Sequence, residues 1–493
     1  MTPQSPAGGV PAEGRVTARF EPADGQLVLR GAGARPTAAR LEGRRAHVAA
    51  RVTGGGKTWT VRLPLRIARW GGPELPLPSG EYRLSIDGVD AAALDAVAVP
   101  LSVLPGLRAQ LKGDRLIVGP PVDPVYDGSE ALAALERRYA AHEAPLENAV
   151  FFESFYGRGA GCNPLAIDRE IARVAPRVIR YWSVVDLSVR VPEGAVAVVE
   201  GSPEWWRARS AARLLVVNDW LRRRFVRRAG QTVLQTWHGT PLKRLALHRP
   251  GFDPRRAGAV VKESLRWDVL LAQNPYAARI LRKAYAFLGR PLWVEGYPRN
   301  DVLVGGDAGA VRAELGIAPD ERVLLYAPTW RDDRQEIVDF LDPEALAAAT
   351  GAVVLVRGHS RTLMPGQDVA GARVIDVTGY PDTAPLLLAA DALITDYSSV
   401  MFDFGVTGKP MYFFVPDMEH YRGQLRGFYF DLARRAPGPL VRTQDELVAA
   451  LAGDPADYAE RYAAWTARFN ARDDGRAAER VVARILDRGY IQR

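Results

Sequence analysis

From residue 148 onward, short apolar runs alternate with stretches of helical character, and this alternation restricts the fold more than any other feature. The first set of runs lies at 149–152, 178–182, 196–199, 214–217, 233–236 and 269–272, and the second at 323–326, 353–356, 392–395 and 411–414. Strands that alternate with helices form parallel sheets covered on both faces. The pattern predicts two consecutive doubly wound α/β domains of Rossmann type, facing a cleft at the carboxyl ends of their strands.

The chain before residue 148 has a different character. Residues 1–14 are rich in Pro, Gly and Ala, which predicts disorder. Short strand-like runs and turn signals at 15–121, without helical stretches, predict a β-rich, sandwich-like domain. Residues 122–147 read as a proline-containing linker and an amphipathic helix around 129–142. The two α/β domains then occupy 148–305 and 306–493, the second ending in helices.

The segment Gln235-Thr-Trp-His-Gly-Thr-Pro-Leu-Lys243 is the strongest candidate for chemistry. It follows a strand-like run; Gly239 permits a tight turn, and Thr240 and Pro241 suit the N-cap and first position of a helix. His238 is therefore expected between a strand and a helix, with free backbone N–H groups and a lysine nearby. Open α/β sheets bind anionic ligands at such places. The alternative is a turn whose histidine merely caps the helix.

Polar side chains also follow the strands of the second domain. They are Thr329 and Arg331, Arg357 and His359, Ser398 and Ser399, with Asp403 and Lys409 further along. An arginine can clamp a phosphate through a bidentate fork, and serines at a helix start offer hydroxyl and N–H groups to a diphosphate. Each cluster alone could be a helix cap or a solvated loop. Their repetition in a two-lobed chain predicts a shared anion site.

Several classes of site lose support. Neither G-x-G-x-x-G nor G-x-x-x-x-G-K-[ST] occurs, which argues against dinucleotide oxidoreductases and P-loop NTPases. The pair Asp332-Asp333 lacks a D-x-D spacing, the six histidines show no H-x-x-x-H pairing, and one cysteine cannot form a thiolate zinc site. We therefore expect no metal and no cofactor. Cationic side chains and helix dipoles could stabilise a leaving phosphate instead of Mg²⁺.

Composition indicates the surroundings in which the chain works. The single Cys162 excludes an internal disulfide and fits a reducing compartment. The N-terminus has no signal-peptide character, and no apolar run approaches the ~20 residues that span a bilayer. A cytoplasmic or membrane-peripheral location is expected. The net charge of +8 favours nucleic acid, anionic lipid or a phosphorylated substrate as partner, although an arginine-biased composition accounts for part of it.

Taken together, these segments resemble the CDP-glycerol glycerophosphotransferase family, which includes teichoic acid polymerases and primases. The resemblance covers about 148–470. It is carried by Phe152-Glu-Ser154, Cys162-Asn-Pro164, the 235–243 segment, Gln273-Asn-Pro275, Gly296-Tyr-Pro-Arg-Asn-Asp301, Tyr326-Ala-Pro-Thr-Trp330, Arg357-Gly-His359 and Asp396-Tyr-Ser-Ser-Val-Met-Phe-Asp403. It implies a metal-independent, GT-B-like pair of lobes, acceptor lobe first and CDP-alditol donor lobe second, at the cytoplasmic membrane face.

The resemblance also implies a reaction and roles for the residues. An acceptor hydroxyl attacks the glycerol-bearing phosphorus of CDP-glycerol, and CMP leaves. His238 is the implied general base and His359 a second catalytic residue; Asp403 would contact the glycerol hydroxyls. The implied diphosphate and nucleotide site comprises Thr329, Arg331, Arg357, Ser398, Ser399 and Lys409. The implied acceptor side comprises Glu153, Asn163, Thr240, Lys243 and Asn274. The acceptor would be lipid-linked or polymeric glycerol phosphate or a capsular polymer, and nucleic acid would not be a partner.

Alternatives stay open at this point. The donor could be CDP-ribitol, the enzyme could be a GT-B glycosyltransferase for nucleotide sugars, or the chain could be a non-catalytic envelope-binding protein. For membrane association, the candidate is the basic, aromatic-flanked segment at 220–228, which is expected to be helical. Its arginines could instead hold a polyanionic acceptor or simply be solvated.

Overall fold

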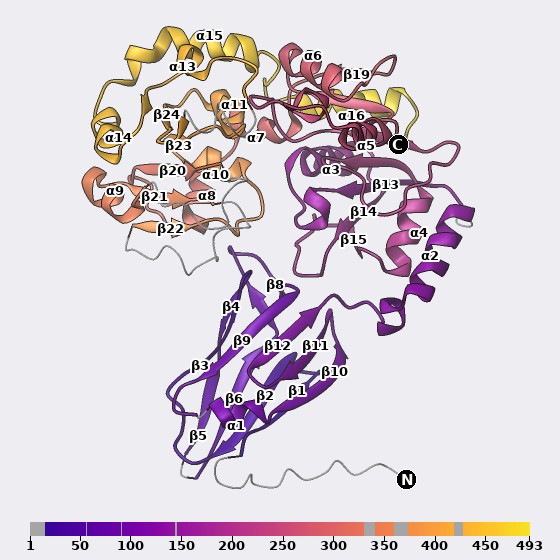
Figure 1. The fold of residues 1–493 in the computed structure, drawn as a ribbon, viewed down its shortest axis with the longest axis vertical. Helices are drawn as coiled ribbons and strands as arrows, with labels where there is room; N and C mark the ends of the chain where they lie inside the picture. Colours follow the sequence, from indigo (N-terminus) through magenta and orange to yellow (C-terminus); the bar gives the residue numbers. More distant parts are fainter. Residues whose placement is uncertain are drawn as a thin grey trace. The chain divides into compact units, whose positions relative to one another are not determined.

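The computed structural model describes residues 15–55, 57–89, 91–142, 145–329, 341–358, 373–418 and 427–493. The chain divides into two compact units (Figure 1). The first comprises the chain up to Ala131 together with Val185–Arg190. The second comprises Leu132–Val184 and Val191–Arg493.

The first unit is β-rich, as the sequence predicts. Its described part contains a four-stranded antiparallel sheet in the order β1 (Thr17–Glu21), β2 (Gln26–Ala32), β6 (Thr58–Pro64), β5 (Arg51–Gly55). A six-stranded sheet runs in the order β10 (Ala98–Leu104), β11 (Leu107–Lys112), β12 (Arg115–Gly119), β9 (Gly80–Ile86), β3 (Ala39–Gly43), β4 (His47–Ala49). The pair β7 (Arg66–Ala68) and β8 (Glu74–Pro76) and the short helix α1 (Ala91–Asp95) complete the unit.

The two larger sheets share one hydrophobic core. Strand β6 reads TWTVRLP and buries every second residue, which is the alternation of a strand with one face on the core. Trp59 and Leu63 from this strand belong to the same buried cluster as Tyr82 of β9 and Leu116 of β12. This packing of two antiparallel sheets is the arrangement that the sequence predicts for 15–121.

The second unit contains two parallel sheets. Within the described ranges, the first has the order β15 (Val196–Val199), β14 (Ile179–Val184), β13 (Glu147–Glu153), β16 (Ala212–Val217), β17 (Thr232–Gln235), β18 (Val269–Ala272), β19 (Leu292–Val294). The second has the order β22 (Val374–Asp376), β21 (Val353–Val356), β20 (Val323–Ala327), β23 (Ala392–Thr395), β24 (Met411–Phe414), β25 (Leu440–Val441). We call these halves the first lobe and the second lobe.

Helices cover the faces of both sheets, which explains why central strands such as β18 (VLLA) and β21 (VVLV) are buried at every residue. The first lobe holds α2 (Ser129–Ala141), α3 (Cys162–Val174), α4 (Pro203–Ala211), α5 (Pro254–Ser264), α6 (Pro275–Ala284) and α7 (Asp301–Gly305). The helices that follow are α8 (Ala308–Glu314), α9 (Pro343–Thr350), α10 (Ala384–Ala389), α11 (Val400–Phe404), α13 (Leu432–Arg435), α14 (Gln444–Leu451), α15 (Ala459–Phe469) and α16 (Ala477–Asp487). The 3₁₀ turns are η1 (Pro124–Asp127), η2 (Phe155–Gly157), η3 (Ala246–His248), η4 (Pro298–Asn300), η5 (Gly405–Thr407) and η7 (Pro455–Tyr458).

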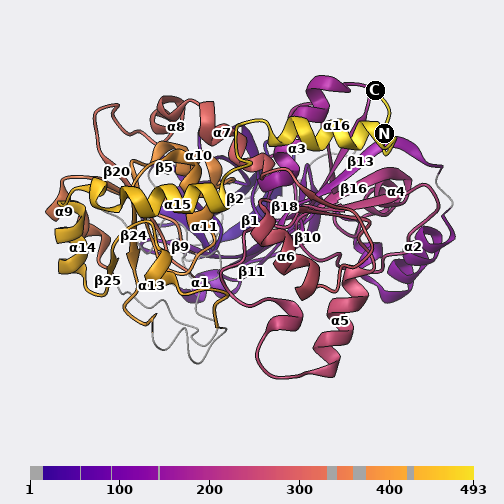
Figure 2. The same ribbon diagram turned by 90° about the horizontal axis from the view of Figure 1, so that it is seen from above.

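The end of the chain returns to the first lobe. Helix α15 lies along the second lobe, whereas α16 packs beside α3 of the first lobe (Figure 2). The carboxylate of Asp301 accepts hydrogen bonds from the backbone N–H groups of Ala477 and Ala478, at 2.9 and 2.8 Å, and so caps the start of α16. The segment between α15 and α16 therefore links the two lobes.

Strand order determines where a ligand can bind. In each sheet the order reverses beside the strand that comes first in the chain, between β13 and β16 in the first lobe and between β20 and β23 in the second. Ligands of open α/β sheets bind in the crevice outside the carboxyl ends of the strands at such a reversal. The loops after these strands are consequently the places to examine for a site.

The expected helix at 220–228 is absent. The chain there is irregular between β16 and β17. Arg222 and Arg223 both form ion pairs with Glu200 at 2.7 Å, and Arg227 pairs with the aspartate just before β18. The helical prediction is wrong because these arginines are engaged by carboxylates of neighbouring elements, which a local pattern does not reveal.

We predict that Gly438→Ala destabilises the second lobe. A Cβ at this position would lie 1.8 Å from the backbone oxygen of Met411 in β24, so the strand would have to shift. Such overpacking should lower the free energy of unfolding by about 2 kcal/mol or more, seen as a lower midpoint in thermal denaturation. Gly258→Ala is the matched control, because a Cβ there meets nothing within 4 Å and Ala favours helix α5. Equal midpoints for the two variants would contradict the packing described.

Candidate active site

We call residues 236–243 the histidine loop; it follows β17 at the carboxyl edge of the first sheet. Its histidine, His238, is half-buried, stacks on Trp237 with ring centroids 4.7 Å apart, and meets Phe155 edge-on. His238 Nδ1 lies 2.6 Å from the backbone oxygen of Asn218, which follows β16. A carbonyl oxygen only accepts hydrogen bonds, so the proton of the neutral imidazole sits on Nδ1. Nε2 therefore carries the lone pair and can accept a proton.

No helix begins in the histidine loop, so the prediction of Thr240 as N-cap and Pro241 as first helical residue is wrong. The chain stays irregular, and Lys243 forms an isolated antiparallel bridge with Phe428 of the second lobe. The next helical turn is η3, and the next α-helix is α5. The Thr240 hydroxyl, which would have capped a helix, instead donates to Gln273 Oε1 at 2.5 Å. Tertiary hydrogen bonds override the local capping signal here.

The backbone of the histidine loop is fixed from behind by two side chains. Asn163, at the start of α3, is fully buried and donates from Nδ2 to the carbonyls of Thr236 and Trp237, at 3.4 and 3.2 Å. Arg299, in η4, donates from Nη1 to the carbonyl of His238 at 3.0 Å. Asn163, expected on the acceptor side, thus contacts the loop that carries His238.

A buried polar network continues beneath the loop. Asn274 donates from Nδ2 to the Thr240 hydroxyl at 3.1 Å, and its Oδ1 accepts from Ala277 N at the start of α6. Gln273 donates from Nε2 to Asp473 at 2.8 Å. Thr240 and Asn274, both predicted on the acceptor side, are buried and engaged in this network.

Asp473 lies in the segment that joins α15 to α16. Besides Gln273, it accepts from the backbone N–H of Tyr297 at 2.9 Å and from Asn470 Nδ2 at 3.1 Å. Asn470 also donates to the carbonyl of Phe402 in α11, at 2.7 Å. The network therefore connects the first lobe to α11 of the second lobe. Burial raises the pKa of Asp473 from 3.8 to about 6.

The second lobe supplies polar groups at the reversal between β20 and β23. The backbone N–H of Thr329, after β20, donates to both oxygens of Asp396, after β23, at 2.9 and 3.1 Å. Ser398 and Ser399 follow immediately and precede α11, with Ser398 Oγ accepting from Val400 N at 3.4 Å. Hydroxyl and N–H groups thus gather at the crevice where strand order predicts a ligand.

The histidine loop lies directly against this part of the second lobe. A Cβ built on Gly239 would come within 2.6 Å of Ser399 Oγ, so only glycine allows this approach. Lys243 Nζ lies 3.5 Å from Thr329 Oγ1. The structure therefore brings together four of the predicted residues, His238 and Lys243 from the first lobe with Thr329 and Ser399 from the second.

A buried ion pair also joins the lobes beside His238. Arg299 donates from Nη2 to Asp403 Oδ2 at 2.7 Å and from Nε to Oδ1 at 3.3 Å. Its Nη1 also donates to Cys162 Sγ at 3.0 Å. Burial alone lowers the pKa of Arg299, but the Asp403 carboxylate outweighs this and raises the pKa above its ordinary value. Asp403, expected to contact glycerol, is thus linked to the loop that carries His238.

Other predicted residues lie elsewhere or are tied to the protein itself. Lys409 precedes β24, at the opposite edge of the sheet, and donates to the carbonyls of Leu388 and Ala390 at 2.8 and 2.6 Å. Its expected contact with a diphosphate is not supported, because the start of a parallel strand lies away from the carboxyl edge. Arg357 follows β21 at the carboxyl edge and donates to two carbonyls of the loop after β22. His359 and Arg331 lie outside the described residues.

Glu153 is at the carboxyl end of β13 but is buried among core side chains. Its Oε2 accepts from the Ser183 hydroxyl at 2.8 Å, and Ser183 in turn accepts from Trp205 Nε1. Burial raises the pKa of Glu153, and Arg209 opposes this shift. Its carboxylate is thus engaged within the first lobe, and its expected role on the acceptor side stays a prediction.

Sequence reasoning missed several residues that shape this region. They are Asn218, Gln273, Arg299, Asp396 and Asp473. Asn218 and Asp396 follow apolar strand-like runs and carried the same strand-end signal as the residues that were chosen. Gln273 and Arg299 lie inside the quoted motifs, but nothing in the motifs reveals their partners. Asp473 had no sequence signal.

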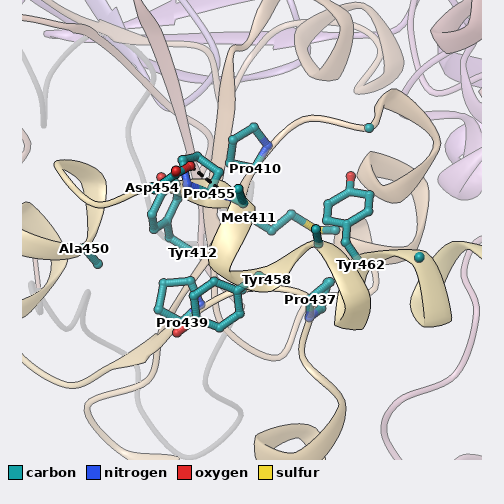
Figure 3. A pocket seen from close by; sticks show the side chains of 15 residues that line it. Pro410, Met411, Tyr412, Pro437, Pro439, Ala450, Asp454, Pro455, Tyr458 and Tyr462 are labelled. Carbon is teal, nitrogen blue, oxygen red and sulfur yellow. Dashed lines mark hydrogen bonds between the residues drawn. The ribbon is translucent and has the colours of Figure 1, made fainter.

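A separate pocket of about 430 Å³ opens at the other edge of the second sheet (Figure 3). Prolines and tyrosines line it, including Pro410 before β24, Pro439 before β25, and Tyr458 and Tyr462. These residues precede their strands, whereas the residues around His238 follow theirs. The pocket is therefore distinct from the crevice at the carboxyl edge.

Comparison with known proteins identifies the family. The family model described as CDP-Glycerol:Poly(glycerophosphate) glycerophosphotransferase matches residues 138–487. The chain belongs to this family. It is 37% identical over 365 residues to a teichoic acid poly(glycerol phosphate) polymerase of Bacillus subtilis, covering 68% of this chain and 48% of that one. It is 34% identical over 382 residues to a teichoic acid glycerol-phosphate transferase of Staphylococcus aureus, covering 69% of this chain and 94% of that one.

Comparison with solved structures supports the same family. The wall teichoic acid polymerase TagF, in a His-to-Asn variant soaked with CDPG, superposes with a TM-score of 0.67 at 32% identity, covering 73% of this chain and 94% of that one. The predicted GT-B-like pair of lobes and the predicted family are therefore confirmed, as is a glycerophosphotransferase at the level of the family. The chain spans about half the length of the Bacillus subtilis polymerase.

No helix in the described ranges is long and apolar enough to cross a membrane. Among the described residues, no group of three or more His, Cys, Asp or Glu side chains is arranged to hold a metal ion.

We predict that Asp473 makes stability depend on pH. Its pKa is raised above the usual value, so the folded protein binds the proton more tightly than the unfolded chain. The resulting stabilisation is present at pH 4 and is lost as the pH rises through about 6. The free energy of unfolding of the wild type should therefore fall by about 3 kcal/mol relative to that of Asp473→Asn between pH 4 and 7, at ~1.4 kcal/mol for each unit of the pKa shift, because the Asn side chain does not titrate. Denaturation of both proteins across this range measures the change. A difference that stays constant over this range would contradict the assignment.

Proposed function

We propose that this chain transfers glycerol phosphate from CDP-glycerol to a hydroxyl group of a teichoic-acid-type acceptor and releases CMP. Family membership and the names of its relatives support the donor and the reaction. The observation that carries the mechanism is the hydrogen bond from His238 Nδ1 to the Asn218 carbonyl. It leaves Nε2 as the proton acceptor in a loop that touches Ser399 of the second lobe.

The proposed step is balanced as follows. An acceptor hydroxyl loses its proton to His238 Nε2 while its oxygen forms a bond to the glycerol-bearing phosphorus. The bond from that phosphorus to the bridging oxygen breaks, and CMP leaves with the electron pair. A neutral imidazole is suited to general-base work near pH 7.

Groups of the second lobe are proposed to stabilise the charge on the diphosphate. Ser398, Ser399 and Thr329 offer hydroxyls at the crevice, and Lys243 adds an ammonium group within 3.5 Å of Thr329 Oγ1. His359 and Arg331 remain predictions for this site. These donors make a metal unnecessary in the proposed mechanism, because fixed dipoles and cations can stabilise developing charge.

We propose that Asp403 has two roles. Its ion pair with Arg299 supports the backbone of His238. A carboxylate has about four lone-pair sites, so it can accept from glycerol hydroxyls while Arg299 occupies one site on each oxygen. The expected glycerol contact is thus compatible with the ion pair.

We predict that His238→Ala lowers turnover by about 10²- to 10⁴-fold, the usual loss when a general base is removed. Binding of CDP-glycerol, followed by calorimetry, should persist, because the proposed donor contacts are made by the second lobe and by Lys243, not by the imidazole. His238→Asn is the stricter variant, since its amide can still donate to the Asn218 carbonyl but cannot act as a base. CMP release is measured in excess EDTA, where the wild type should remain active.

Three outcomes would contradict this proposal. A variant that keeps more than about a tenth of the wild-type rate would remove His238 from the role of base. Activity that EDTA abolishes and Mg²⁺ restores would overturn the metal-independent mechanism. Release of UMP or UDP from UDP-sugars, or faster turnover of CDP-ribitol than of CDP-glycerol, would assign a different donor.

We further propose that the chain binds anionic membranes through α5 rather than through 220–228. Phe252, just before α5, is 89% exposed, and Leu265, just after it, is 64% exposed. Arg255 and Lys262 on the helix are exposed as well. The helix projects from the edge of the first lobe (Figure 2). Apolar side chains flanked by cations suit an anionic bilayer, where each Lys or Arg contributes about 1 kcal/mol.

We predict that Phe252→Ser with Leu265→Ser reduces flotation with anionic liposomes at low salt. The comparison variant replaces Arg222, Arg223, Arg224, Arg227 and Arg228 with Gln. It should float like the wild type, because several of these arginines are already paired within the protein. If the arginine variant fails to float and the double serine variant floats normally, the membrane contact lies at 220–228.

A further inference from the structure

Nearly all the net charge of the protein resides in the β-rich unit. Residues 15–121 contain sixteen Lys and Arg against nine Asp and Glu, a formal charge of +7 out of +8 for the whole chain. The catalytic lobes are therefore almost neutral overall. A general arginine bias does not explain this distribution, because the lobes have acidic residues to balance their arginines and the β-rich unit does not.

Part of this positive charge lies on one face of the four-stranded sheet. Residues directly opposite each other in neighbouring antiparallel strands point to the same face. Arg51 of β5 is opposite Arg62 of β6, and Arg62 is opposite Val28 of β2. Arg30, two residues beyond Val28, shares this face. The residues that alternate with these along the strands, such as Val61 and Leu29, point to the core on the other side of the sheet.

These three arginines have no carboxylate partner. Within the part of the chain that the structure describes, Arg30, Arg51 and Arg62 form no ion pair, although Arg51 and Arg62 are like charges placed side by side. The outer face of the six-stranded sheet is different. Its arginines pair with acids as Arg40–Glu42, Arg83–Asp114 and Arg115–Glu81. Among the described residues, the four-stranded sheet pairs only Arg19, with Glu21 of β1, on the face of these three arginines, so this face keeps a positive charge that the outer face of the six-stranded sheet balances with acids.

We propose that this face, which we call the arginine face (Arg30, Arg51 and Arg62), binds the growing poly(glycerol phosphate) chain. Like charges directly opposite each other destabilise a sheet, so an arrangement without acidic partners indicates an external anion. A planar guanidinium matches phosphate oxygens, and a row of them suits a ligand with one negative charge in each repeat. The identity of the polymer rests on the proposed function; the positive face itself does not.

Two features favour a polymer over a membrane surface. The arginine face also carries Thr53 and Thr60, opposite each other in the next row, whose hydroxyls can donate to phosphate oxygens. The exposed large apolar side chains of this unit lie on the other sheet and after it, at Leu101 and Val103 of β10, Ile117 of β12 and Val125 of η1. A surface that docks on a bilayer needs apolar groups beside its cations, and the arginine face has hydroxyls in that place.

Polymer binding by a second module would serve chain elongation. A polymer held on one part of the protein has an end that re-enters the active site at a raised effective concentration, so successive additions outcompete release. The arginine face should therefore govern the affinity for long acceptors and the length of the product. It should not affect the first addition to an acceptor too short to reach both sites.

The test uses the full chain with Arg30→Gln, Arg51→Gln and Arg62→Gln combined. The matched control combines Arg40→Gln, Arg83→Gln and Arg115→Gln, which removes the same charge from the other face of the same unit. Binding of defined-length poly(glycerol phosphate) is measured by fluorescence anisotropy over a series of salt concentrations. We expect the arginine-face variant to bind at least about tenfold more weakly at low salt. The slope of log affinity against log salt concentration should become shallower by about 2, at ~0.7 for each phosphate contact that is lost. The control should bind like the wild type.

Activity supplies the second readout. With CDP-glycerol, the arginine-face variant should make shorter polymers while the rate of a single addition to a short soluble acceptor stays unchanged. Equal binding by the two triple variants would overturn the inference, because net charge alone would then explain any effect. Unchanged polymer binding with lost flotation on anionic vesicles would also overturn it, in favour of a membrane contact. Polymer binding through this face without any CMP release would leave the inference standing and reject the proposed function.

Discussion

The Arg299 guanidinium holds the candidate site together. It is buried at the junction of the two lobes, where it pairs with Asp403 of α11 and donates to the backbone oxygen of His238. Removing either partner would leave a buried charge without compensation, which typically costs 3–5 kcal/mol, so the pair resists separation. The position of the histidine loop therefore depends on the second lobe, and the donor side of the crevice depends on the first.

Contacts at the same junction also fix the position and the tautomer of His238. Strand order brings the loops after β16, β17, β20 and β23 to the carboxyl edges of the two sheets. The Asn218 carbonyl fixes the protonated nitrogen of His238, and Gly239 lets the loop approach Ser399 without a steric barrier. The Asp473 network supports this arrangement from beneath by linking Gln273 and Tyr297 to α11 through Asn470. Backbone and buried polar groups thus set the state of the one side chain proposed to move a proton.

Sequence reasoning succeeded where the signal is local or periodic. Apolar runs located the central strands of both lobes, and strand ends located His238, Thr329 and Ser399. It failed where tertiary contacts decide: Thr240 was expected to cap a helix, but its hydroxyl bonds to Gln273 instead. Lys409 was assigned to the wrong edge of the sheet because a residue before a strand and one after it look alike in a motif. Arg299 stood inside a recognised motif, yet its partners come from elements about sixty and a hundred residues away along the chain.

The central claim is that Asn218 holds His238 with its proton on Nδ1. Nitrogen-15 NMR of the protein labelled at its six histidines tests this directly, with His238→Gln identifying the signal that disappears. In the neutral form of His238, we expect Nδ1 to show the shift of a protonated ring nitrogen and Nε2 that of an unprotonated one. The opposite pattern, with the proton on Nε2, would contradict the account, because a nitrogen that already carries a proton cannot take one from the acceptor hydroxyl.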